Sequence, residues 1–257
     1  MIRKLGKRPP KYDARTLQFA NYMDRMPGPL PTPPAEISYV VKVPNWPVLL
    51  NDQLGDCVIA AMGHMVQQWT YFATEGAAMQ TMTNAEALAA YEAIGGYDPN
   101  NPDSDDGASM LEALNYWHNE GIAVQGQNHK IAGYVQINTN DLLEVRQAIW
   151  MFGNLFTGLQ MPLYAADEAD WTVAQGGIYT PAGAPGSWGG HCVPMMAESP
   201  ETLTCVTWGA RLKLSHNFLF DYADEAYAIL SPDWITSQGE TIAGFDLAAL
   251  RRDIAAL

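Results

Sequence analysis

The longest uninterrupted hydrophobic pattern in the chain begins at Cys57. Apolar residues occur on every side of a helical projection of residues 57–75, which is typical of a buried helix rather than a surface one. In the loop that precedes it, Gly55 permits a tight turn and Asp56 can cap the helix N-terminus. The pattern therefore predicts a buried helix with Cys57 in its first turn.

Helical periodicity recurs in the first half of the chain, and short alternating segments follow in the second half. We predict helices at 84–94 (with Thr83 or Asn84 as cap), 108–120 (ended by Gly121) and 141–151, a short helical turn within 15–26, and an amphipathic helix at 245–257. We predict strands at 154–160, 190–197, 202–208 and 225–230. Because helices come first and strands second, the fold class is α+β rather than alternating α/β.

The N-terminal segment 1–47 is rich in proline, which removes backbone donors and discourages helix. We therefore divide the chain into an extended arm at 1–47 and a domain at 48–257. Within that domain we place a helical lobe at about 48–152, a β lobe at about 153–240 and the closing helix.

The excess of acidic residues limits which kinds of partner the chain can bind. The chain of 257 residues carries 14 Lys and Arg against 28 Asp and Glu, so its surface is unsuited to nucleic acid. No apolar run approaches the roughly 20 residues that cross a bilayer. The one basic cluster is at the start: Arg3, Lys4, Lys7, Arg8 and Lys11. It is either a solvated tail or, within residues 1–26, an arm that docks on an acidic neighbour such as another copy of this chain.

No disulfide framework or zinc site is predicted from the three cysteines, Cys57, Cys192 and Cys205, since their number is odd and their spacing fits neither. The acidic loop at 98–106 could hold Ca²⁺ through carboxylates, but it lacks the full spacing of a calcium-binding loop. A solvated acidic loop is the alternative, and we predict neither a cofactor nor a metal.

Nucleophilic chemistry is the sharper candidate. A thiol at a helix N-terminus gains thiolate character from the helix dipole, and the unpaired backbone N–H of Cys57 could stabilise an oxyanion. A base must come from elsewhere in the chain. His64 lies two turns along the same helix, too far away, and His118, His129 and His216 lie among polar neighbours. The fifth histidine, His191, follows flexible glycines and opens an apolar strand, so it can project into a cleft.

Six segments in order carry a family resemblance. Asn51-Asp-Gln-Leu-Gly-Asp-Cys57-Val-Ile-Ala-Ala resembles the nucleophile motif of papain-like cysteine peptidases. Other segments resemble that family's mature N-terminus, its cleft glycine with the following helix, the crossing to the second lobe, the approach to the catalytic histidine, and its Asn-Ser-Trp-Gly motif. They are, in turn, 30–51, 106–122, 140–159, 176–193 and 207–209.

The resemblance implies a two-lobed papain-like fold and a set of roles. Cys57 resembles the nucleophile and His191 its base, and Trp208 resembles the aromatic residue that shields the histidine. Asp106, Gly107, Gly190 and Trp208 would line the substrate cleft.

The chain also departs from the family pattern. Asn51 stands at the offset of the oxyanion-hole glutamine, while Gln53 is nearer to Cys57. Either amide could donate, and Asn51 ranks ahead on spacing. Val206 or Thr207 stands where the family has the asparagine that orients the histidine. Thr207 could accept a hydrogen bond from the imidazole. Asp56 works against a thiolate by raising its pKa, unless it only caps the helix.

Two functional hypotheses follow. The first is hydrolysis of peptide or isopeptide bonds through a Cys57–His191 dyad. The second is a catalytically weak or inactive structural or adhesive component of a phage particle, because the Asn-Asp-x-x-Gly-Asp-Cys variant resembles bacteriophage-encoded members. The N-terminus lacks the apolar stretch of a secretory signal. This lack predicts a host-cytoplasmic or virion location if the chain is phage-encoded. We also expect a peptide or protein substrate, and no inhibitory propeptide of usual length.

Overall fold

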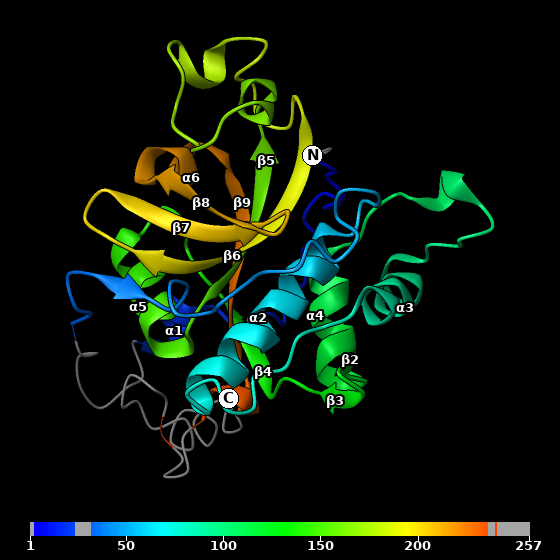
Figure 1. Cartoon of the computed structure of the whole chain (residues 1–257). Helices are drawn as coiled ribbons and strands as arrows, with labels where there is room; N and C mark the ends of the chain where they lie inside the picture. The colour runs from blue at the N-terminus through cyan, green and yellow to red at the C-terminus, as the bar shows by residue number, and fades with distance from the viewer. Residues whose placement is uncertain (1–2, 24–31, 236–239, 241–257) are drawn as a thin grey trace.

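A computed structural model describes residues 3–23, 32–235 and 240 (Figure 1). Its α-helices are α1 (Phe19–Met23), α2 (Cys57–Ala73), α3 (Asn84–Gly95), α4 (Met110–Asn119), α5 (Leu142–Phe152) and α6 (His216–Tyr222). Its strands are β1 (Ile37–Ser38), β2 (Ile122–Val124), β3 (Gln127–His129), β4 (Gly133–Gln136), β5 (Leu155–Met161), β6 (Gly189–Glu198), β7 (Thr202–Thr207), β8 (Ala210–Ser215) and β9 (Ala223–Leu230).

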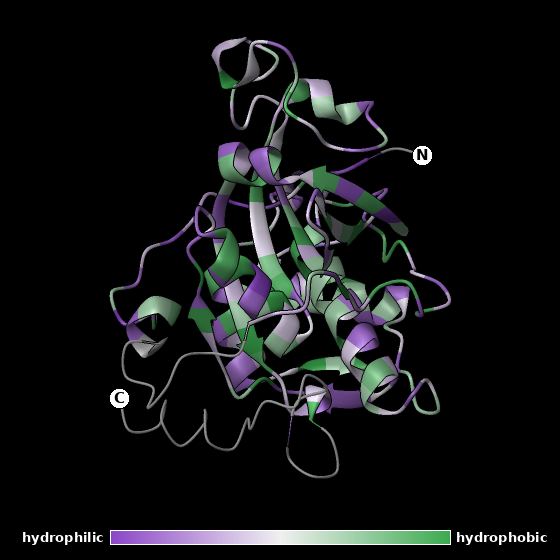
Figure 2. Ribbon diagram, turned by 90° about the vertical axis from the view of Figure 1, so that its left-hand side faces the viewer, coloured by the Kyte–Doolittle hydropathy of each residue, from purple (hydrophilic) through white to green (hydrophobic). Residues whose placement is uncertain are grey.

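One antiparallel sheet organises the molecule, with the strand order β4-β9-β5-β6-β7-β8 and β1 added to β6. One hydrophobic core lies between this sheet and α2, α3 and α4. A second core lies on the other face, beneath α5 and α6. Figure 2 shows hydrophobic residues along the strands at the centre and hydrophilic ones at the periphery. The antiparallel sheet with helices packed on both of its faces confirms the predicted α+β fold class.

The long helix α2 is buried along almost its whole length, as the hydrophobic pattern predicts. Its polar residues are compatible with burial because they bond to backbone carbonyls: Gln68 Nε2 donates to Gly153 O at 2.9 Å, and Trp69 Nε1 donates to Phe152 O at 2.9 Å. These two bonds tie α2 to the end of α5, and so fix the position of the helix that begins at Cys57.

The predicted cap of α2 is wrong. Asp56 has φ −100° and ψ 22° and makes no side-chain capping bond, because a capping side chain needs the extended conformation that residue 56 does not have. Thr83, by contrast, is extended and forms a complete capping box with Glu86 at the start of α3.

The remaining helices and strands follow the prediction closely at their centres, while β1, β2, β3, β4, β8 and α6 were not predicted. The predicted helix at 245–257 lies outside the described residues. Across the described part of the chain, no helix combines the length and apolarity needed to cross a membrane.

Candidate functional site

Cys57 is the first residue of α2, and its side chain is wholly buried. Burial raises the pKa of its thiol to about 12, and the Asp56 charge acts in the same direction. The backbone N–H groups of Cys192 and Gly6, which lie beside the sulfur, oppose this effect. The sulfur is therefore a protonated thiol enclosed between β6, which carries Cys192, and the N-terminal arm, which carries Gly6.

His191 opens the buried part of β6, directly before Cys192. Its Nε2 lies 2.7 Å from Thr207 Oγ1, and its ring stacks on Trp208 with centroids 4.5 Å apart and planes 10° apart. Trp171 meets the same ring edge-on at 6.2 Å. Three side chains thus fix the plane and the rotation of this imidazole.

The other ring nitrogen of His191 is free. Within the described residues Nδ1 is buried and has no hydrogen-bond partner. In the tautomer that donates from Nε2 to Thr207, Nδ1 carries an open lone pair. Burial, followed by the nearby charge of Arg3, lowers the pKa of His191 to about 3, so in this closed arrangement the ring is neutral and can accept a proton.

Asp56 lies beside the thiol with both carboxyl oxygens buried and without hydrogen-bond partners in the described structure. Burial raises its pKa to about 8, and the amide of Asn51 opposes that rise. At neutral pH the group is therefore mostly a neutral acid, which weakens the expected repulsion between its charge and a Cys57 thiolate.

The two amides predicted to support the oxyanion occupy different environments. Asn51 is buried, and its Nδ2 donates to Leu54 O at 3.2 Å, while Gln53 is exposed. The structure brings neither side chain into a hydrogen bond with Cys57. Of the two residues that could orient the histidine, Thr207 makes the contact, and Val206 packs into the core beside α2.

The N-terminal arm runs between the two halves of the predicted cleft (Figure 1). The N–H groups of Gly6 and Lys7 both donate to Gly190 O, at 3.1 and 3.0 Å. On the opposite side Arg8 N donates to Ala108 O at 2.9 Å, and Ala108 N donates to Gly6 O at 2.8 Å. The predicted cleft glycines, Gly107 and Gly190, therefore contact the chain's own residues.

Close packing in this cleft depends on glycine. A Cβ on Gly6 would lie 1.7 Å from Gly55 O, and one on Gly107 would lie 1.9 Å from Gly6 O. Asp106 has an exposed side chain, and its carbonyl accepts from Arg8 Nε at 3.2 Å. The arm therefore sits against the backbone on both sides, directly over Cys57.

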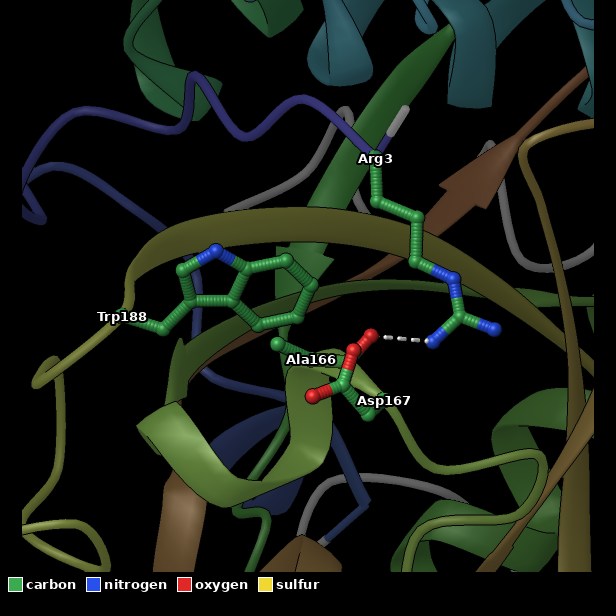
Figure 3. A pocket seen from close by; sticks show the side chains of 4 residues that line it. All are labelled: Arg3, Ala166, Asp167 and Trp188. Carbon is green, nitrogen blue, oxygen red and sulfur yellow. Dashed lines mark hydrogen bonds between the residues drawn. The ribbon is translucent and has the colours of Figure 1, made fainter. Parts of the chain in front are cut away.

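Further along the arm toward its start, Arg3 lies over the Trp208 ring at 5.1 Å and donates to Ala166 O at 2.8 Å. Trp208 Nε1 donates to Lys4 O at 3.0 Å, so the aromatic shield of His191 also holds the arm. A pocket of about 400 Å³ lies here. Figure 3 shows Trp188 on one side of it and the Arg3 guanidinium reaching toward Ala166.

Sequence reasoning missed several of these contacts. Trp171 is isolated in the sequence and reaches His191 only because it bridges to β8 at Leu214. Ala108 was assigned to a helix, although α4 begins at Met110. The basic arm was expected to dock on an acidic neighbour, and in the structure its residues 3–11 dock on this chain itself. The contrast between the basic N-terminus and the otherwise acidic chain was the signal in the sequence for this docking.

One residue of the acidic loop at 98–106, Asp105, has a structural role. Asp105 Oδ1 accepts from Gly55 N and from Tyr91 Oη, both at 2.8 Å, which anchors the turn just before Cys57. In the described ranges, no group of three or more His, Cys, Asp or Glu is arranged to hold a metal ion.

Comparisons with known proteins identify solved structures that have a similar fold. No protein-family model matches the chain, and no curated protein matches its sequence. Among solved structures, Xylellain, a cysteine protease from Xylella fastidiosa, is similar over 90% of this chain and 98% of its own, with a TM-score of 0.64 and 11% identity.

Two further solved structures are similar. Digestive procathepsin L 3 from the larval midgut of Tenebrio molitor aligns over 89% of this chain and 75% of its own, with a TM-score of 0.56 and 11% identity. Cathepsin B S9 from Trypanosoma congolense, in its pro form, aligns over 89% and 86%, with a TM-score of 0.55 and 13% identity. The chain therefore has the fold of the papain-like cysteine proteases.

Proposed function

We propose that this protein is a cysteine peptidase in which Cys57 is the nucleophile and His191 the base, acting on peptide or isopeptide bonds. One observation carries the proposal. The Cys57 sulfur lies against β6 beside Cys192, the residue that follows His191, while the histidine is held through Nε2 and keeps Nδ1 free. A buried imidazole with one nitrogen fixed and the other unpartnered is what a general base requires.

The chemistry follows from these positions. His191 Nδ1 takes the thiol proton, and the Cys57 sulfur attacks the substrate carbonyl carbon to form a tetrahedral oxyanion. The backbone N–H of Cys57 is in the first helical turn, where it has no intrahelical acceptor, and can donate to that oxyanion. His191 then returns the proton to the leaving amine as the C–N bond breaks, leaving a thioester on Cys57. Water, deprotonated by His191, hydrolyses the thioester and restores the thiol.

In the structure described here the site is closed. The arm covers the sulfur, and burial holds the thiol protonated and the imidazole neutral. Displacement of the arm would admit solvent and substrate, which lowers the pKa of Cys57 and raises that of His191 toward an ion pair. The proposed activity therefore requires that residues 3–11 leave the cleft.

Labelling by an epoxide or iodoacetamide probe, read by mass spectrometry, tests the dyad in the full-length Gly6→Ala chain, whose arm cannot keep its place against Gly55 O, beside the same chain with Cys57→Ala or His191→Ala added. We expect Cys57 to react faster than Cys192 or Cys205, and His191→Ala to abolish the difference. His64→Ala is a matched control, because His64 is also buried and bonds to Pro47 O at 2.7 Å. Equal, slow labelling of the three thiols, with no peptide hydrolysed, would favour the inactive structural role in a phage particle.

The arm's docking on a partner is a separate proposal. A second copy of this chain offers the same acidic cleft, so an arm displaced from its own chain could enter a neighbour's. Sedimentation of the full chain across a range of concentrations tests this exchange: we expect a dimer at high concentration, and a monomer at every concentration would exclude it.

A further inference from the structure

Lys7 of the arm is buried in an acidic pocket beside the candidate nucleophile. Its side chain is 1% exposed, and its Nζ lies 2.8 Å from Asp224 Oδ2 and 3.2 Å from Glu225 Oε1. The same ammonium donates to Arg8 O at 3.2 Å. Two carboxylates face one ammonium, so without Lys7 the pocket would carry uncompensated negative charge.

An irregularity in the sheet builds this pocket. Strand β9 pairs with β5 through Gly158 opposite Glu225 and Leu159 opposite Ala223, so Asp224 is an extra residue in the ladder. Successive strand residues normally point to opposite faces, and a bulge relieves that constraint. Both carboxylates can therefore reach the same ammonium, although they are adjacent in the chain.

The strand opposite leaves room for a long side chain. A Cβ on Gly158 would lie 2.2 Å from Lys7 Cε and 2.8 Å from Asp224 Oδ1, so any other residue there would fill the pocket. A neighbouring cavity of about 220 Å³, lined by Lys7, Gln160, Gly190 and Asp224 among others, remains open beside the arm.

The pocket lies next to the candidate nucleophile, because the arm residue that fills it directly follows the arm residue beside Cys57. Gly6 lies beside Cys57, with its N–H donating to Gly190 O at 3.1 Å, and the next residue, Lys7, places its side chain between Asp224 and Glu225. Any extended peptide that replaced the arm over Cys57 would therefore place a side chain near these carboxylates. Glu225 is 3% exposed, and an apolar occupant would leave its charge buried and unpaired.

The geometry points to a recognition pocket formed by Gly158, Asp224 and Glu225 that accepts a lysine or arginine side chain of a peptide substrate, with Lys7 as its occupant in the closed chain. This inference rests on the proposed peptidase function, because it names the substrate class of that same cleft. It assigns Asp224 and Glu225 as specificity-determining residues.

The test uses the full chain with Lys7→Met, whose shape is close to lysine but which lacks the charge. We expect the Cys57 alkylation rate to rise about tenfold, because the arm loses its buried ion pairs. Lys42→Met, at an exposed lysine outside residues 3–11, is the matched control and should leave the rate unchanged. Lys7→Arg keeps the charge and should stay slow, which separates loss of the pair from misfolding.

The probes are two acetylated tetrapeptide amides, Leu-Gly-Lys-Arg, which copies residues 5–8, and Leu-Gly-Met-Arg. In the Lys7→Met chain the lysine peptide should protect Cys57 from alkylation at about tenfold lower concentration than the methionine peptide. Adding Asp224→Asn and Glu225→Gln should remove that preference. Equal protection by the two peptides, or an unchanged alkylation rate in Lys7→Met, would overturn the proposal that this pocket recognises a basic side chain.

Hydrolysis is read separately on a peptide library that carries a basic or an apolar residue at each position. Cleavage without preference for a basic residue would overturn the pocket and leave the peptidase function standing. Selective protection by the lysine peptide, with no library member cleaved, would retain the pocket as a binding site and defeat the peptidase function.

Discussion

The two sides of the candidate site differ in what holds them. On the sheet side, His191 is fixed by Thr207, Trp208 and Trp171, all of which belong to the β-rich region. On the helix side, the Cys57 sulfur is enclosed by Cys192 of β6 and by Gly6 of the arm, next to the unpartnered carboxyl of Asp56. The base is held by the folded domain, whereas the nucleophile is partly enclosed by a segment that can leave.

This difference predicts which substitutions affect Cys57 and which affect His191. Changes in the arm should alter the accessibility and pKa of Cys57 and leave the orientation of His191 intact. Changes beside His191 should lower the reactivity of an already opened site. The predictions below separate the two sides, in order of decreasing effect.

Gly6→Ala should have the largest effect, since a Cβ at this position would lie 1.7 Å from Gly55 O, a backbone atom. The arm cannot keep its position, and we expect the Cys57 alkylation rate near neutral pH to rise by about two orders of magnitude as the thiol becomes exposed. Gly133→Ala is the control, because a Cβ there meets nothing within 4 Å. A rate unchanged by Gly6→Ala would mean that the arm does not protect the thiol.

Asp56→Asn should change the pH dependence of stability. The folded pKa of about 8 is above the ordinary 3.8, so between these values the unfolded chain releases a proton that the folded chain keeps. The free energy of unfolding therefore falls as pH rises through this window, by up to about 1.4 kcal/mol per pH unit. Asp56→Asn should remove that loss, as measured by urea titrations across the window. Parallel curves for the two proteins would contradict the buried, neutral state of Asp56.

Thr207→Val removes the partner of His191 Nε2 while keeping the shape of the side chain. An unpaired buried donor costs about 1–3 kcal/mol, so in the Gly6→Ala background we expect Cys57 alkylation to slow by about tenfold. Thr207→Ser should restore most of the rate, because it keeps the hydroxyl. If valine and serine gave the same rate, Thr207 would only fill space.

Arg3→Met should have the smallest effect. It removes a cation–π contact with Trp208 and a bond to Ala166 O, and such contacts at partly exposed sites contribute about 0.5–1 kcal/mol. We expect a two- to threefold rise in Cys57 alkylation, by about the factor that this energy gives. A rise as large as that of Gly6→Ala would show that Arg3, rather than backbone packing, holds the arm.

Much of this arrangement could be predicted from the sequence. The apolar run after Cys57 indicated a buried helix, and the glycines before His191 indicated a strand start that faces a cleft. These patterns are local, because a helix or strand is encoded by neighbouring residues. The predicted cap at Asp56 is wrong because a capping side chain needs an extended backbone at that residue, and φ −100° with ψ 22° is not extended.

The rest depended on long-range pairing. Nothing near Trp171 in the sequence shows that it meets His191, since the contact requires the bridge to β8. Equally, Lys7 and Asp224 are joined only in the folded chain, and the bulge that aligns Asp224 with Glu225 leaves no pattern in a single strand. In the same way, no pattern in the sequence shows that the arm crosses the predicted cleft, because its bonds to Gly190 and Ala108 join distant parts of the chain.

The most direct test is the pH profile of Cys57 alkylation in the Gly6→Ala chain, with and without His191→Ala. If Cys57 and His191 form a dyad that the arm masks, the opened chain should react rapidly down to about pH 6, as a thiolate paired with an imidazolium does, and His191→Ala should abolish that reactivity. A rate that rises only toward an ordinary thiol pKa of about 8.5, identical with and without His191, would contradict the account.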